Sequence, residues 1–398
     1  MTALSGGPQG TRPLALRRAR LALCVLLPLA STTCGPPDAT GPDELVFRIG
    51  VLAHTSPEMQ AVSGVPTLEA AEMAAAELNE EGGILIGDQR VPVRIVAREH
   101  TARLENVTSA ARSLINLDSV HVLVGPQFSQ HAIPVGGIAN RSGVPMISPM
   151  SSNPATTAGR PYVFRLAFLD ADQGEVLAGF ARDSLGLGRV GVLVNLTSSY
   201  ATEVAERFSR RFRELGGEIV EERYPGGEPD VWRRAFRAVL AQRPDRIFLP
   251  LQRPELEALM QMIEEESIPV KLLGADSWDV LTMERFPAAQ GAYLTHQWMW
   301  NVPDHEAAPF VTRYRARYGS PPRSTAALTY DAVRVMARAA SSAGSLDGSA
   351  IRDALSGLPT YAGVSGPIAF GSSNSPDRDV VISRIEDGTA VFVARLRP

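Results

Sequence analysis

The sequence predicts an α/β protein built from two doubly wound parallel-sheet lobes. Short apolar segments typical of buried strands alternate with amphipathic segments typical of helices, and such alternation indicates parallel sheets with helices on both faces. The alternating body has roughly 355 residues, too many for one hydrophobic core. Hydrophobic residues make up 44% of the chain and charged residues 21%, an ordinary globular composition.

The first series of elements runs up to a break near Phe164 to Asp170, where a second series begins. Thr67 to Glu81, for example, places Leu68 and Ala71 on one helical face, and Gly82-Gly83 ends the helix. The strands expected in this series are Leu45–Leu52, Val91–Ala97, Val120–Val124 and Val144–Ser148, and the helices are Thr67–Glu81, Asn106–Leu117 and a segment through Ala139.

The second series ends near His296 and is followed by two helices and a β-rich tail. Its strands are expected at Arg189–Val194, Ile219–Tyr224, Arg246–Leu251 and Val270–Gly274, and Tyr200–Leu215 is one of the helices between them. The two later helices are Ala308–Tyr318 and Thr325–Ser342, and the tail strands are Val380–Ile385 and Ala390–Leu396.

Residues 1–33 have the layout of a secretory signal peptide. Four arginines precede a ten-residue apolar segment, Leu21 to Ala30, which is too short to span a membrane. Cys34 then lies where a bacterial lipoprotein carries its acylated cysteine, although Ser31 and Thr33 depart from the usual lipobox. Residues 34–44 are rich in proline and glycine and predict a tether. We therefore expect a membrane-anchored lipoprotein on the periplasmic or extracellular face, with simple cleavage near Cys34 as the alternative.

The charge pattern excludes several functions. The net charge is -4, and the basic residues are scattered arginines apart from one lysine, Lys271, so nothing points to nucleic acid. Lys271 does not stand in a P-loop or kinase motif. Gly186 to Gly191 matches G-x-G-x-x-G, but it follows an expected helix and runs into a strand. It is therefore interpreted as a helix end and turn, and not as a dinucleotide site.

No signature of catalysis or of a cofactor is present in the sequence. The six histidines show no metal-ligand spacing, no G-x-S-x-G motif occurs, and Cys24 and Cys34 are the only cysteines. We therefore expect no cofactor, no metal and no enzymatic activity.

Residues that are mostly polar or aromatic follow the carboxyl ends of five expected strands. Ligands of open α/β sheets bind at these ends, so the residues are expected to line one cleft if the lobes face each other. They are Ser129 after the third strand, Met150, Ser151 and Ser152 after the fourth, and Tyr200, Gln252, Asp276 and Trp278 in the second lobe.

These residue types suit a zwitterion with a side chain. Ser129 and Ser152 offer hydroxyls near helix starts, where backbone N–H groups and the helix dipole favour a carboxylate. Asp276 offers a charge for an ammonium group. Tyr200 and Trp278 offer flat apolar walls, although Trp278 also fits a place in the core.

The chain resembles the Leu/Ile/Val-binding family, the type I periplasmic binding proteins of bacterial ABC importers. The resemblance runs from about Phe47 to the C-terminus and depends on the order and spacing of its motifs. They are IGVLAHTS (49–56), AAAELNEEGGI (74–84), VGPQFS (124–129), GVPMISPMSSNP (143–154), YVFRLAFLDADQG (162–174), GADSWD (274–279), YRARYGSPP (314–322) and TYDAV (329–333).

The resemblance implies two lobes joined by three crossovers that close on a ligand by a hinge. The third crossover is expected near Gly366 to Asp377, which gives lobe 1 residues 45–167 and 297–368 and lobe 2 residues 168–296 and 369–398. The resemblance also implies that Ser129 and Ser152 hold the ligand carboxylate. The carbonyl of Met150 and the acid of Asp276 would hold the ammonium group, and Tyr200 would close from the other lobe.

Three departures from the family pattern weaken a strict leucine, isoleucine or valine assignment. Ser63-Gly64 replaces an aromatic residue before glycine, Ala201 replaces a glycine, and Gln252-Arg253 replaces aromatic or small residues. Arg253 could pair with an acidic or amide ligand or be a solvated loop residue.

The function expected is therefore an extracytoplasmic receptor that captures a small amino acid or related polar solute and delivers it to ABC permease subunits. A ligand-sensing lipoprotein without a transporter and a hydrolase on the same scaffold stay open as alternatives, because fold alone does not separate them.

Overall fold

The computed structural model describes residues 45–253, 255–280, 285–303 and 306–398, and it confirms the predicted α/β fold. The predicted signal peptide, Cys34 and the tether lie outside these residues. Leu45–Pro398 forms one compact unit by itself. No helix among the described residues has the length and apolar character needed to cross a membrane.

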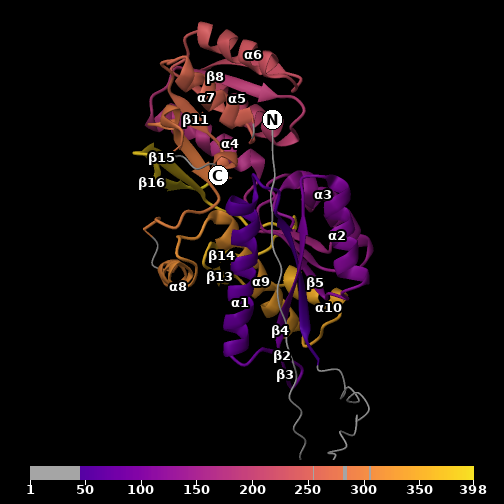
Figure 1. Ribbon diagram of the computed structural model, residues 1–398. Coiled ribbons are helices and arrows are strands. Elements are labelled where there is room, and N and C mark those ends of the chain that lie inside the picture. The colour runs from indigo at the N-terminus through magenta and orange to yellow at the C-terminus, as the bar shows by residue number, and fades with distance from the viewer. Residues whose placement is uncertain (1–44, 254, 281–284, 304–305) are drawn as a thin grey trace, which may run out of the picture. The chain divides into compact units, whose positions relative to one another are not determined.

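The first sheet consists of five parallel strands in the order β4-β1-β5-β6-β7 (Figure 1). Seven of the eight residues of β1 are buried, as expected for a central strand covered on both faces. The strands are β1 (Phe47–His54), β4 (Val93–His100), β5 (Val122–Val124), β6 (Met146–Ser148) and β7 (Val163–Arg165).

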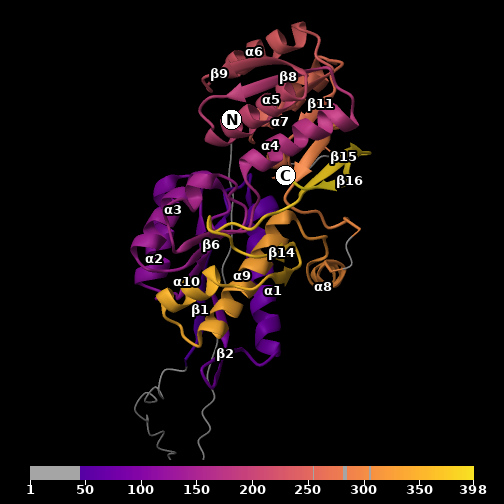
Figure 2. The same ribbon diagram turned by 180° about the vertical axis from the view of Figure 1, so that it is seen from behind.

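Alternate side chains of β1 point to opposite faces of this sheet, and both sets include buried apolar side chains, so helices cover both faces. Phe47, Ile49 and Val51 pack with α1 (Val65–Glu80), α8 (Ala308–Tyr318), α9 (Ser324–Ala343) and α10 (Gly348–Ser356). Leu52 packs on the other side, with α2 (Leu104–Asn116) and α3 (Ser129–Arg141). Figures 1 and 2 show these helices on either side of the strands.

The second sheet has seven strands in the order β16-β15-β12-β11-β10-β8-β9. Five are parallel, and the two C-terminal strands add to the edge in antiparallel direction. The parallel strands are β8 (Arg189–Asn195), β9 (Glu218–Tyr224), β10 (Arg246–Leu249), β11 (Leu272–Gly274) and β12 (Tyr293–His296), and the antiparallel ones are β15 (Val380–Glu386) and β16 (Thr389–Leu396). The predicted parallel sheet of this lobe is therefore confirmed, and the predicted β-rich tail forms its antiparallel edge.

Two pairs of helices enclose the second sheet. Phe248 of β10 packs with α4 (Asp170–Gly179) and α5 (Ser199–Glu214). Ile247 and Leu249 of the same strand face the other side, toward α6 (Pro229–Ala241) and α7 (Glu255–Glu265). Each sheet therefore sits between two helical layers, and we refer to the two assemblies as lobe 1 and lobe 2.

The chain passes between the two sheets three times. The passages lie between β7 and α4, after β12, and between β14 (Gly366–Ile368) and β15. Before the third passage, in the turn that leads into β14, the buried carboxylate of Asp331 accepts hydrogen bonds from the backbone N–H groups of Val364 and Ser365. Arg378 donates to the carbonyl of Ser365. The residue boundaries predicted for the lobes stay a prediction, because contacts join 45–398 into one unit.

Two small hairpins fall outside the predicted pattern. One pairs β2 (Ile84–Ile86) with β3 (Gln89–Val91), and the other pairs β13 (Tyr361–Gly363) with β14. Three-residue strands are too short for period-two alternation to be recognisable. The Gly186 motif lies between the helical segment that follows α4 and strand β8, with Gly186 at φ +65°, so its interpretation as a helix end and turn is confirmed.

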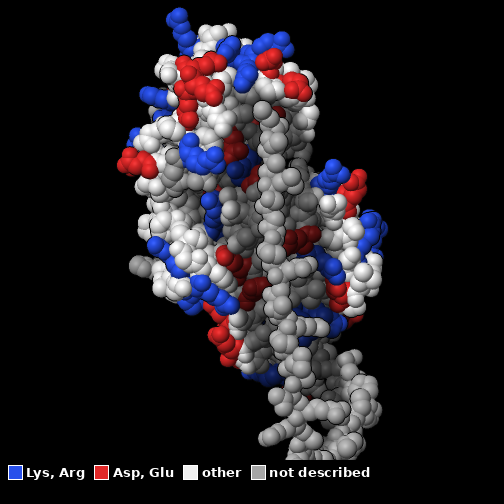
Figure 3. Space-filling model, in the orientation of Figure 1, with Lys and Arg blue, Asp and Glu red and all other residues white. Residues whose placement is uncertain are grey.

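Basic and acidic side chains are interspersed on the surface. Figure 3 shows arginine and carboxylate side chains mixed over the visible face of both lobes. On α5, for example, Arg207 pairs with Glu203 and Arg210 pairs with Glu175 of α4. This distribution agrees with the scattered arginines in the sequence.

Gly174 allows α4 and α5 to pack closely. A Cβ atom at Gly174 would lie 2.7 Å from the carbonyl oxygen of Val204 and 2.9 Å from the Cβ of Arg207. We predict that Gly174→Ala lowers the free energy of unfolding by about 1–3 kcal/mol, because the helices must move apart. Gly179→Ala is the matched control, since a Cβ there meets nothing within 4 Å. Urea denaturation of both variants tests this, and equal stability would contradict it.

Candidate functional site

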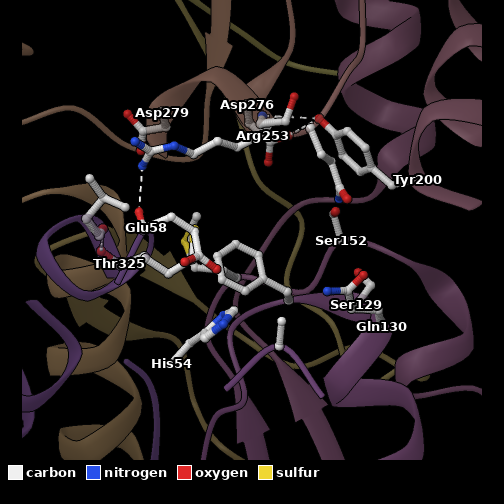
Figure 4. Close-up of a pocket in the computed structure, with 17 residues that line it drawn as sticks. His54, Glu58, Ser129, Gln130, Ser152, Tyr200, Arg253, Asp276, Asp279 and Thr325 are labelled. Atoms are coloured by element: carbon white, nitrogen blue, oxygen red, sulfur yellow. Dashed lines mark hydrogen bonds between the residues drawn. The ribbon is translucent and has the colours of Figure 1, made fainter. Parts of the chain in front are cut away.

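A cavity of about 430 Å³ lies where the carboxyl ends of both sheets meet (Figure 4). Six of the eight predicted ligand-binding residues line it: Ser129, Met150, Ser152, Tyr200, Gln252 and Asp276. The lobe 1 residues follow β5 and β6, and the lobe 2 residues follow β8, β10 and β11. The cavity has the size and the position at strand ends that small-molecule sites favour.

One corner of the cavity is built from serine hydroxyls at the N-terminus of α3. The hydroxyl of Ser151 donates to Oγ of Ser129 at 2.9 Å, and the backbone N–H of Asn153 donates to the same oxygen at 3.4 Å. Because Ser129 accepts from both, its own hydrogen remains to be donated into the cavity. Together with the dipole of α3, this hydrogen favours an anionic group.

Ser151 therefore lies behind the site and not in its wall. It is fully buried, exchanges a 2.6 Å hydrogen bond with Thr156, and is not part of the cavity lining. Its contact with Ser129 makes it a positioning residue. Ser152 lines the cavity, and its carbonyl accepts from the backbone N–H of Asp170 at 3.1 Å.

The opposite corner holds the buried carboxylate of Asp276. The hydroxyl of Tyr200 donates to Oδ1 at 2.5 Å, and the amide of Gln297 donates to Oδ2 at 2.9 Å. Burial raises the pKa of Asp276, although these two hydrogen bonds favour the ionised form. Burial and the neighbouring Asp276 raise the pKa of Tyr200 well above its usual value, so Tyr200 remains a donor. The corner can receive an ammonium group.

Asp170 lies beneath the serine corner and is fully buried. Burial raises its pKa to about 8. The carboxyl is therefore mostly neutral at pH 7, and it adds little negative charge next to the serine hydroxyls that favour an anion.

Trp278 belongs to the core of lobe 2. It is fully buried among the side chains between the second sheet and α7, and its indole N–H donates to the carbonyl of Leu249 at 2.8 Å. It does not line this cavity. From its position after β11, Trp278 could line the cavity or pack in the core. The short helical turn over Asp276–Val280 directs it into the core, and the sequence carries no signal for that direction.

The remaining wall comes largely from residues that sequence reasoning missed. Met59, Val62, Ala102 and Phe128 supply apolar surface, and the polar members are His54, Glu58, Gln130, Ser277, Asp279 and Thr325. His54 ends β1, so the rule applied to five other strands would have found it. The apolar members lie in loops and carry no comparable signal.

Arg253 joins the two lobes at the cavity. Its guanidinium donates to the carbonyl of Glu58 in lobe 1 at 2.6 Å (Figure 4). It also pairs with Glu257 of α7 at 2.7 Å. Of the two interpretations of Arg253 that the sequence left open, neither included this contact between lobes.

The chain belongs to the periplasmic binding protein family, whose model matches residues 46–390. A Leu/Ile/Val-binding protein homolog from Brucella abortus is 26% identical over 325 residues, which cover 80% of this chain and 84% of the relative. The leucine binding protein LivK from Thermotoga maritima has 26% identity and a TM-score of 0.79, with 89% of this chain and 99% of that one covered.

A second solved structure was determined with ligand. The branched-chain amino acid transporter substrate binding protein LivJ from Streptococcus pneumoniae, in complex with isoleucine, has 25% identity and a TM-score of 0.77, covering 89% of this chain and all of that one (100%). The resemblance to branched-chain amino-acid binding proteins predicted from the motifs is thus confirmed. The family consists of solute-binding proteins and not of enzymes, and its name agrees with the expected extracytoplasmic location.

Three buried histidines beside the cavity predict a loss of stability in acid. Burial lowers the pKa of both His54 and His100 from 6.5 to about 4. The unfolded chain therefore binds more protons than the folded protein between these values, so the free energy of unfolding falls as the pH drops from 6.5 to 4. The rings of His54 and His100 each contribute about 2 kcal/mol to this fall.

We predict that His100→Gln makes the fall less steep. Denaturation of the wild type and the variant at pH 7, 6, 5 and 4 measures the two slopes. Parallel curves would show that His100 is not held neutral by the fold.

Proposed function

We propose that the protein is an extracytoplasmic receptor that binds a small amino acid or a related polar solute between its lobes and delivers it to an ABC permease. The observation that carries the proposal is that one cavity has a site suited to an anion at one corner and a site suited to a cation at the opposite corner. Hydroxyls at the start of α3 suit a carboxylate, and the buried Asp276 suits an ammonium group. A free α-amino acid presents both groups on one carbon.

The comparisons support the role without identifying the ligand. The relatives named above are described as leucine or branched-chain amino-acid binding proteins, and one was solved with isoleucine. We extend to this chain a transport role, the absence of catalysis, and attachment to the membrane through Cys34. Ligand contacts that bridge the lobes would favour the closed state, which is the form we expect a permease to recognise.

Thermal denaturation against a panel of amino acids, amides and simple carboxylates tests the proposal. A ligand at 100 times its Kd adds about 2.7 kcal/mol to stability. An amino acid should therefore raise the melting temperature, and a panel without any such shift would refute the proposal.

Asp276→Asn should weaken amino-acid binding by about 30-fold or more, because the ammonium group loses its buried partner. Binding of simple carboxylates should change little, since they lack the ammonium group. Asp347→Asn, at the N-terminus of α10, is the control because it exchanges one good N-cap for another outside the cavity. Calorimetric titration measures the Kd values, and an amino-acid Kd unchanged in Asp276→Asn would exclude the ammonium assignment.

Ser129→Ala should weaken both amino acids and simple carboxylates by about tenfold, since a hydrogen bond to a charged group is lost. Ser151→Ala should cause a smaller loss of the same kind, although Ser151 does not touch the cavity, because Ser129 loses its orienting donor. If Ser129→Ala spares carboxylates, the anion lies elsewhere.

A further inference from the structure

One buried amide joins two of the three passages between the lobes, which together we call the hinge. Gln297 lies in the second passage, directly after β12, and its side chain is only 3% exposed. Its Oε1 accepts a hydrogen bond from the backbone N–H of Phe168 at 3.0 Å. Phe168 belongs to the first passage, between β7 and α4. The relative position of these two passages therefore depends on where the amide of Gln297 is held.

The other end of the same amide holds the acid of the proposed ammonium corner. Nε2 of Gln297 donates to Oδ2 of Asp276 at 2.9 Å. The partners fix the direction of the amide, because the backbone N–H of Phe168 can only donate and must face the oxygen. Asp276 lines the cavity and Gln297 does not, so a ligand would act on Gln297 through Asp276.

The other hydrogen bonds of Asp276 stay within lobe 2. Tyr200 of α5 donates to Oδ1, and the backbone N–H of Asp276 donates to Oε1 of Gln173 on α4 at 3.3 Å. Gln173 also accepts from the hydroxyl of Thr295 in β12 at 3.0 Å. Of these hydrogen bonds, the one from Gln297 is alone in reaching the hinge.

We propose that Gln297 is a positioning residue that couples the ammonium corner to the hinge. The inference rests on the proposed function, which places the ammonium group of the ligand at Asp276. Burial disfavours the ionised carboxylate, and an ammonium group beside it favours that form. A hydrogen bond to an ionised acceptor is stronger than one to a neutral acceptor, so the ligand strengthens the contact with Gln297. By linkage, the hinge arrangement that allows this contact raises the affinity for the ammonium group.

A double-mutant cycle tests whether Gln297 acts through the carboxylate. Gln297→Leu should raise the Kd for amino acids by about five- to tenfold, because Asp276 loses a donor. Simple carboxylates should change little, since they do not use this corner. In an Asp276→Asn background the same substitution should raise the amino-acid Kd by less than about twofold. Gln261→Leu, at an exposed position of α7, is the matched control. Calorimetric titration measures all four Kd values.

Small-angle X-ray scattering tests the link to the hinge. A saturating amino acid should lower the radius of gyration of the wild type as the lobes close. At saturation, Gln297→Leu should show a smaller decrease, because the occupied corner no longer acts on the passages. A loss of affinity alone would be overcome by saturation and would leave the decrease unchanged.

Gln297→Glu serves if Gln297→Leu does not fold, because it keeps an oxygen for the N–H of Phe168. Its carboxyl group faces Asp276, so the pair shares one proton at low pH and loses it at higher pH. The ratio of the amino-acid Kd of the variant to that of the wild type should therefore change between about pH 5 and 8. Tyr200, Asp170 and Asp279 also act on Asp276, but they are present in both proteins and largely cancel in the ratio.

The outcomes separate this inference from the proposed function. Equal costs of Gln297→Leu in the two backgrounds, or a constant Kd ratio for Gln297→Glu, would overturn the action through Asp276. A full decrease in the radius of gyration of saturated Gln297→Leu would overturn the coupling to the hinge. Each of these results leaves the receptor role standing. If no amino acid binds the wild type, the proposed function fails and the inference fails with it.

Discussion

The site depends on a carboxylate that the fold removes from water and only partly compensates. Burying Asp276 costs free energy, and the hydrogen bonds from Tyr200 and Gln297 return a part of it. The side-chain donors that the described residues offer to the Asp276 carboxylate, Tyr200 and Gln297, are both uncharged. A cationic group of a ligand would supply the missing positive charge. Its binding would therefore recover part of the free energy that folding spends on burying the carboxylate.

This corner is useful only because a second one lies opposite in the other lobe. Asp276 and Tyr200 follow strands of the second sheet, whereas Ser129 and Ser152 follow strands of the first. A molecule that carries both charged groups on one carbon would contact both lobes at once. Such a molecule would interact more strongly with a closed arrangement than with an open one, and a difference of this kind shifts a conformational equilibrium.

Most of the fold and much of the site could be predicted from the sequence for one physical reason. Parallel strands covered on both faces give long apolar segments with polar residues at their carboxyl ends, and the rule for ligand sites in open sheets then selects Ser129, Tyr200 and Asp276. Side-chain direction within a turn was not predictable, so Trp278 and Ser151 were placed in the cleft although they lie behind it. The loop residues Met59 and Phe128 escaped because apolar loop residues have no period.

The main chain and the side chain of Glu58 make two separate contacts. The carbonyl of Glu58 receives Arg253 from the other lobe, while its carboxylate orders Ser56 and, through it, His54. Every amino acid has that carbonyl, but few have that carboxylate. A substitution at this position would therefore keep the bridge between the lobes and release Ser56 and His54 from their fixed hydrogen bonds, so the two contacts can change independently in evolution.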